Sequence, residues 1–283
     1  MGKIRIAVIF VLFLFSCQEK EKPKAWTYQK TIALDGINPI GIALKGKELW
    51  LSDGDHNRLV AIDQNGKILK SIDSLDRPMH IDANERYLFL AEYGNDRVSN
   101  IEEDETQGNG YKLTPFWIGA QDSLDAPASV AYYDAELAIA DFYNNRILFD
   151  NGKDWITFGK EGKQAGEFYY PTDVQITKDY IWVADAYNNR IQVFDKKGKF
   201  VKMLGQDQKM NAATGLLVTG QEVLITDFEH KRVLVFDHDG QLKQELKKGI
   251  DKATDLLIKD GILHIINYRK GELVLYNAEE IEG

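Results

Sequence analysis

Polar side chains that could do chemistry occupy one equivalent position in successive segments of the chain: His80, Ser129, Asp173 and Asp255. They stand in the short phrases "PMHI", "PASV", "PTDV" and "ATDL", and two similar phrases carry Gly41 and Gly215 at this place. Brought together, an imidazole and two carboxylates could hold a divalent metal ion, and the whole set could bind a small ligand. The alternative is that these residues only solvate a water-filled channel.

A repeat in the sequence would bring these positions together. The phrase "ADFYNNRILF", which begins at Ala140, returns almost unchanged as "ADAYNNRIQVF" from Ala184. Weaker copies surround both, and a period of about 40 residues is typical of propellers and solenoids. An acidic or amide residue marks each unit: Asp53, Glu92, Asp141, Asp185, Asp227 and Asn267. Five places later the units carry Arg58, Arg97, Arg146, Arg190, Arg232 and Glu272.

The sequence of each unit predicts several short strands. Runs such as "PTDVQI", "DYIWVAD", "RIQVF" and "KFVKML" are rich in β-branched and aromatic residues and are separated by turn residues. Four strands in each of six units predict an all-β, six-bladed β-propeller. The last unit stops after its third strand, so we expect the N-terminal segment "AWTYQKTIALDG" to supply the fourth and close the ring. The insertion Glu102–Lys112 predicts an extended loop.

The recurring acid and arginine predict architecture rather than catalysis. A catalytic site needs a few unlike residues in one place, whereas these two recur in five units. A carboxylate at a strand end can accept hydrogen bonds from loop amides. A planar guanidinium can bind loop acceptors at several points.

The segment "GEFYYPTDVQITKDYIWVADAYNNRIQVFDKKGKFVKMLG" (Gly166–Gly205) resembles an NHL repeat, and the other five units resemble weaker copies. The resemblance covers nearly the whole chain after residue 25. It implies a propeller strongly and a function weakly, because NHL propellers include enzymes, substrate-binding domains of ligases and plain binding modules.

Aromatic residues gather in the loops expected on one face of this propeller. The loops between second and third strands carry Tyr93, Phe142, Tyr143, Tyr187, Phe228 and Tyr268, with His56 and His230. The loops before the inner strands add Arg77 and the run Phe168–Tyr170. Aromatic residues on loops predict a recognition face for a protein, peptide or glycan. Alternatively, these rings pack only between adjacent loops.

The N-terminus predicts a lipid anchor. Lys3 and Arg5 precede an apolar run too short for a bilayer span, which is the layout of a secretory signal. The run ends in "LFSC", which resembles the lipobox of bacterial lipoproteins and implies diacylglycerol on Cys17, the single cysteine of the chain. We expect a signal peptide over 1–16, a lipidated cysteine and tether over 17–25, and the propeller over 26–283.

A metal-dependent enzyme is the alternative to a binding module. Resemblance to the peptidyl-hydroxyglycine amidating lyases, six-bladed propellers of NHL type, implies a pore zinc held by three histidines. None of the corresponding residues is a histidine: Ile40, Met79, Ala128, Thr172, Thr214 and Thr254. A lactonase-like hydrolase with a divalent metal in the central pore stays open through Asp173 and Asp255. No nucleophile elbow or phosphate-binding Gly-rich loop occurs, so no catalytic residue is predicted.

The net charge of −9 argues against a nucleic-acid partner, because nucleic-acid affinity comes mainly from Lys and Arg. We therefore expect a lipid-anchored binding or scaffold module for an envelope protein, peptide or glycan. The sequence looks similar to envelope lipoproteins of Bacteroidota-type bacteria, which implies an outer-membrane location, facing either the periplasm or the surface.

Overall fold

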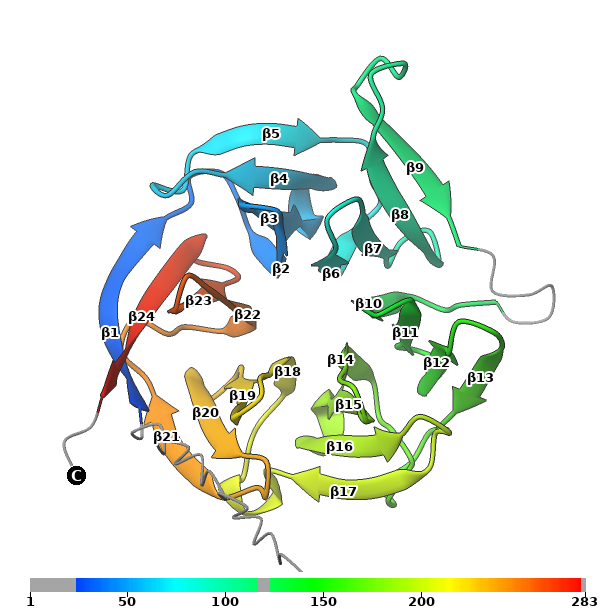
Figure 1. The fold of residues 1–283 in the computed structure, drawn as a ribbon. Coiled ribbons are helices and arrows are strands. Elements are labelled where there is room, and N and C mark those ends of the chain that lie inside the picture. The colour runs from blue at the N-terminus through cyan, green and yellow to red at the C-terminus, as the bar shows by residue number, and fades with distance from the viewer. Residues whose placement is uncertain (1–23, 117–122, 281–283) are drawn as a thin grey trace, which may run out of the picture.

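The computed structural model describes residues 24–116 and 123–280, which form six four-stranded antiparallel sheets arranged as blades around a central axis (Figure 1). The predicted all-β, six-bladed propeller is confirmed. Blades one to three comprise β2 (Pro39–Lys45), β3 (Glu48–Asp53), β4 (Arg58–Ile62) and β5 (Ile68–Ile72); β6 (Pro78–Ala83), β7 (Leu88–Glu92), β8 (Arg97–Glu103) and β9 (Tyr111–Pro115); and β10 (Pro127–Tyr133), β11 (Glu136–Asp141), β12 (Arg146–Asp150) and β13 (Trp155–Phe158).

The other three blades follow the same plan, with the inner strand first. They comprise β14 (Pro171–Ile176), β15 (Tyr180–Asp185), β16 (Arg190–Asp195) and β17 (Phe200–Leu204); β18 (Ala213–Val218), β19 (Glu222–Asp227), β20 (Arg232–Asp237) and β21 (Leu242–Leu246); and β22 (Ala253–Lys259), β23 (Ile262–Asn267), β24 (Glu272–Glu280) and β1 (Lys24–Ala33). Short 3-10 turns lie at Gly54–His56 (η1), Ala186–Asn188 (η2) and Gln206–Gln208 (η3).

The N-terminal strand closes the ring as the sequence predicts. β1 pairs antiparallel with β24, from Lys24 opposite Glu280 to Ala33 opposite Glu272. It begins at Lys24 rather than at the expected boundary of residue 26. Trp26 also ties this blade to blade five, because its indole Nε1–H donates to Glu222 Oε2 at 2.9 Å. The last blade is therefore held from both ends of the chain.

Large side chains of the second strands fill the space between neighbouring blades. Trp50 on β3 is fully buried and packs with Ile81 and Leu88 of blade two. His264 lies at the equivalent position of blade six, where it is buried and its Nδ1 lies 2.9 Å from the Ile262 carbonyl oxygen. Burial lowers the pKa of His264, which suits a neutral core histidine.

The repeated acid and arginine form what we call the blade clamp: the acid ending the second strand, the residue three places later and the arginine five places later. In blade four, Asp185 Oδ1 accepts a hydrogen bond from the Tyr169 N–H, and Asp185 Oδ2 accepts one from Arg190 Nε, both at 2.8 Å. The other guanidinium nitrogens donate to the carbonyls of Lys163, Gln164 and Glu167. The clamp thus folds the loop before the inner strand onto its blade, which confirms the architectural prediction.

Two of the predicted histidines occupy the middle position of the clamp, three residues after the acid. Asn188 donates to Asp185, and in blades one and five His56 and His230 take its place, with Nδ1 2.8 Å from Asp53 Oδ1 and 3.0 Å from Asp227 Oδ2. His56 and His230 lie on the predicted recognition face, but the clamp engages one ring nitrogen of each. Blade six has an amide version in which Asn267 Nδ2 donates to Glu272 Oε2 at 2.9 Å.

The fourth residue after the acid positions the next inner strand. Asn57, Asp96, Asn145 and Asn189 have positive φ angles between 49° and 57°, a conformation that Asn and Asp tolerate better than most residues. Their side-chain oxygens accept the N–H groups of Arg77, Ala126, Tyr170 and Ala212 in the following blade. Each of these acceptors therefore fixes the start of an inner strand, three residues before the position of His80 and its counterparts.

The insertion in blade two is a hairpin, so the prediction of an extended loop over Glu102–Lys112 is wrong. Glu102 pairs with Lys112 and Glu103 with Tyr111, which extends β8 and β9 beyond the ring (Figure 1). The connecting turn is closed by the Asp104 N–H, which donates to the Gly110 carbonyl at 2.8 Å. Local pairing holds the segment because Tyr111 continues the apolar side of β9 and packs edge-on against Trp50.

Candidate functional site

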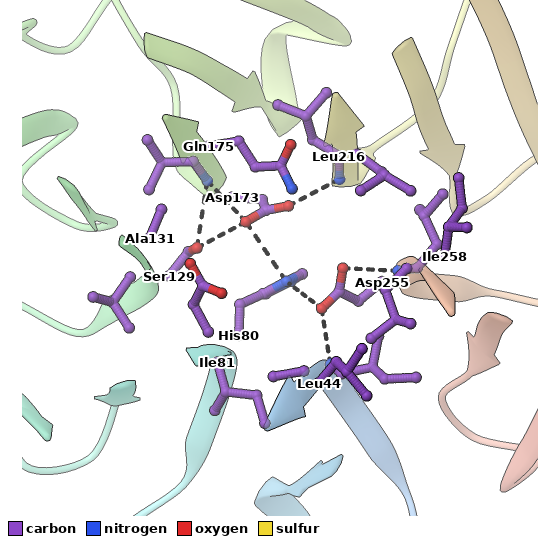
Figure 2. A pocket seen from close by; sticks show the side chains of 18 residues that line it. Leu44, His80, Ile81, Ser129, Ala131, Asp173, Gln175, Leu216, Asp255 and Ile258 are labelled. Atoms are coloured by element: carbon purple, nitrogen blue, oxygen red, sulfur yellow. Dashed lines mark hydrogen bonds and ion pairs between the residues drawn. The ribbon is translucent and has the colours of Figure 1, made fainter. Parts of the chain in front are cut away.

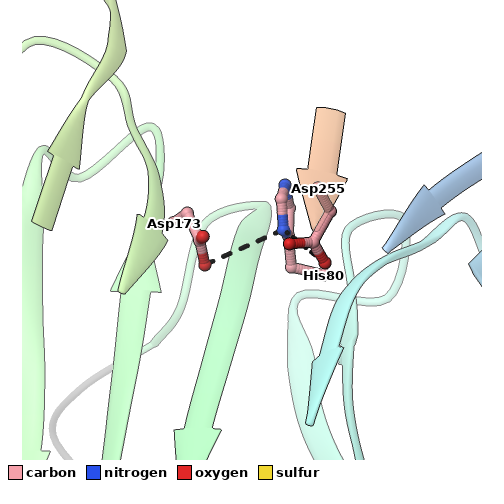
Figure 3. Close-up of side chains that lie close together, drawn as sticks. All are labelled: His80, Asp173 and Asp255. Carbon is pink, nitrogen blue, oxygen red and sulfur yellow. Dashed lines mark ion pairs between the residues drawn. The ribbon is translucent and has the colours of Figure 1, made fainter. Parts of the chain in front are cut away.

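Three side chains converge near the propeller axis: His80 from β6, Asp173 from β14 and Asp255 from β22 (Figure 3). His80 Nδ1 lies 3.4 Å from Asp255 Oδ2 and 3.7 Å from Asp173 Oδ1. One possible ligand atom of each residue lies within 4.8 Å of those of the other two, and all three side chains are buried. We call this cluster the pore triad.

The pore triad comes from alternate blades, and small residues separate its members. Blades one, three and five carry Gly41, Ser129 and Gly215 at the equivalent position. A Cβ atom on Gly41 would meet the His80 Cα at 2.8 Å, and one on Gly215 would meet the Thr254 carbonyl oxygen at 2.2 Å. Because these two glycines admit no larger side chain without a shift, blades one and five leave this level of the ring to the triad and the Ser129 hydroxyl.

Backbone N–H groups orient both carboxylates. Asp173 accepts from the N–H of Val174 and from the N–H of Leu216 in the next blade, each at 2.8 Å. Its Oδ1 also accepts from the Ser129 hydroxyl at 2.7 Å. Asp255 accepts in the same way from Leu256 at 2.8 Å and from Ile42 of blade one at 2.9 Å. Each carboxylate therefore joins its own blade to the next.

The pore triad shifts the protonation of its members. Burial alone would lower the pKa of His80, but the charges of Asp173 and Asp255 outweigh it and raise this pKa to about 9. Burial raises the pKa of Asp173 to about 7 against the opposing charge of His80. In the metal-free protein the histidine is thus an imidazolium between two carboxyl groups.

His80 nevertheless lacks a hydrogen bond at Nδ1. His80 Nδ1 is one of three buried side-chain nitrogen or oxygen atoms without a hydrogen-bond partner among the described residues, because neither carboxylate lies in bonding geometry. Buried polar atoms normally have a partner. A metal ion between the three side chains would supply one, since imidazole nitrogen and carboxylate oxygen are common ligands of divalent transition metals.

A cavity of about 210 Å³ continues from the pore triad (Figure 2). Its lining follows the inner strands past the triad, with polar groups from Asp82 and Gln175 and apolar walls that include Leu44, Leu217 and Ile258. The cavity therefore lies on the side of the triad toward the loops between first and second strands, which we call the hairpin face. The opposite face, with the loops between second and third strands, is the clamp face.

Asp82 is a pore residue that the sequence analysis missed. Burial raises its pKa to about 6, although hydrogen bonds from the N–H groups of Tyr132 and Ala83 oppose the shift. It stands two residues after His80, and side chains two apart in a strand share a side. That spacing could have placed it in the pore.

The clamp face carries an aromatic cluster over blades two to four. Tyr170 stacks on Phe142 at 4.7 Å and on Tyr169 at 4.5 Å between ring centroids. Tyr143 and Tyr187 stand perpendicular to Tyr170, at 5.7 and 5.1 Å. We define the aromatic ridge by its six rings: Tyr93, Phe142, Tyr143, Tyr169, Tyr170 and Tyr187.

The other predicted residues of this face behave differently. Arg77 lies over the Tyr93 ring at 4.7 Å and extends the ridge. Phe228 and Tyr268 lie apart from it: Lys252 covers the Phe228 ring, and the Tyr268 hydroxyl donates to Asp55. Phe168 is fully buried between blades. Cys17, the predicted lipidation site, lies outside the described residues, and within those residues no helix is long and apolar enough to span a bilayer.

An NHL repeat model matches residues 168–194, which span the first three strands of blade four. Protein brain tumor of Drosophila melanogaster is 25% identical over 112 residues, and protein lin-41 of Caenorhabditis elegans is 45% identical over 47 residues. These alignments cover 38% and 16% of this chain and only 11% and 4% of the relatives. They support the presence of the repeat.

Solved propellers resemble the whole ring. A gluconolactonase from Xanthomonas campestris aligns with a TM-score of 0.68 at 13% identity, over 91% of this chain and 100% of its own. Virginiamycin B lyase from Staphylococcus aureus gives 0.64 at 13% identity, over 89% and 99%. A chain of the nidogen/laminin complex gives 0.60 at 15% identity, over 74% and 80%. At such identities the likeness shows the fold alone.

Proposed function

We propose that this six-bladed β-propeller, with an NHL repeat in blade four, is a lipid-anchored binding or scaffold module of a bacterial envelope. Its partner is a protein, peptide or glycan, and the aromatic ridge is the surface that binds it. Anchoring through Cys17 would hold the module at the outer membrane, in the manner of the Bacteroidota-type lipoproteins that the N-terminus resembles.

The aromatic ridge carries this proposal. Tyr143 and Tyr187 are 47% and 58% exposed although each contacts Tyr170, so two large rings are presented on an ordered base. Their separations from Tyr170 put the two exposed rings within about 11 Å of each other. Contiguous exposed aromatic surface is typical of interaction sites, and tyrosine offers a large contact area at low entropic cost.

The position of the first strand agrees with this use of the ridge. Ala33 of β1 lies beside Glu272, which follows a clamp-face loop, so Lys24 at the other end of β1 lies toward the hairpin face. The segment from Cys17 to Lys24 can reach roughly 25 Å at full extension. An anchor on Cys17 would therefore join the propeller on the side of the hairpin face, opposite the ridge.

Affinity purification of the tagged, lipidated protein from detergent-solubilised native membranes tests the proposal. We expect a stoichiometric partner that is lost from a Tyr143→Ser/Tyr187→Ser double variant. A Tyr133→Ser/Tyr180→Ser variant is the matched control, because these tyrosines are 39% and 38% exposed at strand ends of the hairpin face. Equal recovery of the partner with both variants would contradict a role for the ridge.

The anchor is tested separately. Cys17→Ser should move the protein from the membrane fraction to the soluble fraction, because stable anchoring depends on the acyl chains. Retention of the variant in membranes would contradict the lipobox interpretation while leaving the ridge to its own test.

A second candidate function is metal-dependent hydrolysis or elimination in the pore. The observation that favours it is the pore triad at the head of a cavity, because a metal held by three protein ligands retains open positions for water or substrate. Lactones are the first substrates to test, because a gluconolactonase is among the solved propellers with this fold. Purified protein supplied with Zn²⁺ or Mn²⁺ should hydrolyse a member of a lactone panel, and His80→Gln should abolish the activity. No turnover of any lactone would contradict the lactonase-like form.

A further inference from the structure

The ring of residues at the pore is built for three ligands. The imidazole and the two carboxylates alternate with the small residues Gly41, Ser129 and Gly215, and His80 Nδ1 has no hydrogen-bond partner among the described residues. We propose that the pore triad binds one divalent ion of the Zn²⁺ or Mn²⁺ class, and that this ion ties blades two, four and six together. The inference rests on the second candidate function for its metal, but it assigns that metal a structural role.

The distances suit such an ion. Metal–ligand bonds of about 2.1 Å at tetrahedral angles place neighbouring ligand atoms roughly 3.4 Å apart. His80 Nδ1 lies 3.4 and 3.7 Å from the nearest oxygens of Asp255 and Asp173. All three ligand atoms lie within 4.8 Å of one another, so small side-chain movements complete the site. The Ser129 hydroxyl and the cavity both adjoin the triad, so the hydroxyl or a water molecule could supply a fourth ligand.

The donor set selects the class of ion. An imidazole with two carboxylates suits first-row transition ions. Calcium prefers six to eight oxygen ligands, and magnesium keeps most of its water, whereas these three residues are buried. The two carboxylates also balance the charge of a divalent ion bound to a neutral imidazole. We therefore expect Zn²⁺ and Mn²⁺ to bind more tightly than Mg²⁺ and Ca²⁺.

The second hydrogen bond of each carboxylate makes the ion a tie between blades. Asp255 Oδ2, the oxygen nearest His80, also accepts from the Ile42 N–H, across the joint where the last blade meets the first. Asp173 Oδ2 accepts from the Leu216 N–H of blade five. An ion that fixes both carboxylates therefore restrains five blades of the ring through the triad and these two amides.

The experiment uses the mature chain after treatment with EDTA. Isothermal titration with ZnCl₂, MnCl₂, MgCl₂ and CaCl₂ should give one site, with at least tenfold tighter binding of Zn²⁺ or Mn²⁺ than of the other two. The melting temperature should rise with the bound ion, because a ligand specific for the folded state stabilises it. His80→Gln and Asp255→Asn should weaken binding at least 100-fold. Asp82→Asn is the control, because this carboxylate lies in the same pore outside the triad.

Each outcome decides one part of the proposal. Failure of the wild-type chain to bind Zn²⁺ or Mn²⁺ overturns the site and leaves the ridge proposal standing. Amide hydrogen exchange of Ile42 and Leu216 should slow at least tenfold on metal binding. Binding without that protection overturns the structural role and leaves a catalytic metal. Both readouts use the wild-type chain, so a poorly folding variant cannot obscure the result.

Discussion

The blade clamp and the pore triad both pair buried carboxylates with basic side chains, and in both the carboxylates accept backbone N–H hydrogen bonds, but the basic partner is hydrogen-bonded only in the clamp. Asp185 is fully buried and holds Arg190, Asn188 and the Tyr169 amide within hydrogen-bond distance. In the pore, His80 stands beside two carboxylates without a hydrogen bond from Nδ1. The clamp recurs in five blades with an amide version in the sixth, whereas the triad occurs once.

The difference teaches how to separate architecture from function in a repeat protein. A device that every blade needs is repeated and internally complete, so it has no capacity left for a ligand. A cluster assembled from unlike residues of alternate blades depends on the ring having closed. Its incomplete hydrogen bonding is what leaves room for a ligand.

The largest expected effect is in the clamp. Asp185→Ala leaves the guanidinium of Arg190, a residue that is 6% exposed, without its carboxylate. Breaking a buried ion pair from one side typically costs about 3–5 kcal/mol, and we expect that loss in the free energy of unfolding by urea. Asp239→Ala, an exposed turn residue of the same fold, is the control and should change stability by about 0.5 kcal/mol or less. If Asp185→Ala lost no more stability than the control, the clamp would not be the stabilising element that we describe.

A second test replaces the acid–arginine pair of blade five with the amide–acid pair of blade six. Arg232→Glu in blade five places a carboxylate beside buried Asp227 and should destabilise strongly. Adding Asp227→Asn recreates the Asn267–Glu272 pair of blade six and should recover part of the loss. A double-mutant cycle should give a favourable coupling of roughly 1–3 kcal/mol. Additive effects would mean that the blade-six pair is not an equivalent clamp.

The pH dependence of stability tests the triad in metal-free protein. The pKa of His80 in the folded state is about 9, above its ordinary 6.5, so its contribution is complete below pH 6.5 and is lost as the pH rises through 9. The raised pKa of Asp173, about 7, acts in the same direction at lower pH. Since a tenfold change in proton affinity is about 1.4 kcal/mol, stability should fall by roughly 1–3 kcal/mol from pH 6.5 to 9. His80→Gln should flatten this window; an unchanged slope would show that other groups cause it.

Much of this fold could be predicted from the sequence because the same pattern occurs in six units, and each copy supports the interpretation of the others. The acid and arginine recur at fixed spacing, which predicted both the propeller and the clamp. Alignment of the inner strands also selected His80, Asp173 and Asp255 as neighbours. Their distances could not be predicted, because they depend on how close the blades pack, and Gly41 and Gly215 set that approach through backbone contacts.

The aromatic ridge shows where prediction from the sequence ended. The sequence placed Phe228 and Tyr268 with Tyr143 and Tyr187, since all occupy equivalent loops. The structure separates them because the loop before the inner strand of blade four, residues 159–170, brings Tyr170 against the rings of Phe142 and Tyr143 in blade three. Stacking between rings of different blades cannot be predicted from the sequence of one repeat unit. The roles of His56 and His230 in the clamp were missed although each follows its acid by three residues, as Asn188 follows Asp185.

The smallest effect on stability is expected at Tyr187, which lies within the clamp of blade four. Tyr187 stands two residues after Asp185 and three before Arg190, at a position that differs from blade to blade, and it is 58% exposed. Tyr187→Ala should therefore change the free energy of unfolding by about 0.5 kcal/mol or less, measured beside Asp185→Ala. Partner binding should weaken at least tenfold, because exposed aromatic anchors dominate interface energies. One turn would then hold both kinds of residue, the fixed ones that maintain the blade and the variable one that meets the partner. A destabilisation by Tyr187→Ala comparable to that of Asp185→Ala would show that the ridge, too, is architecture.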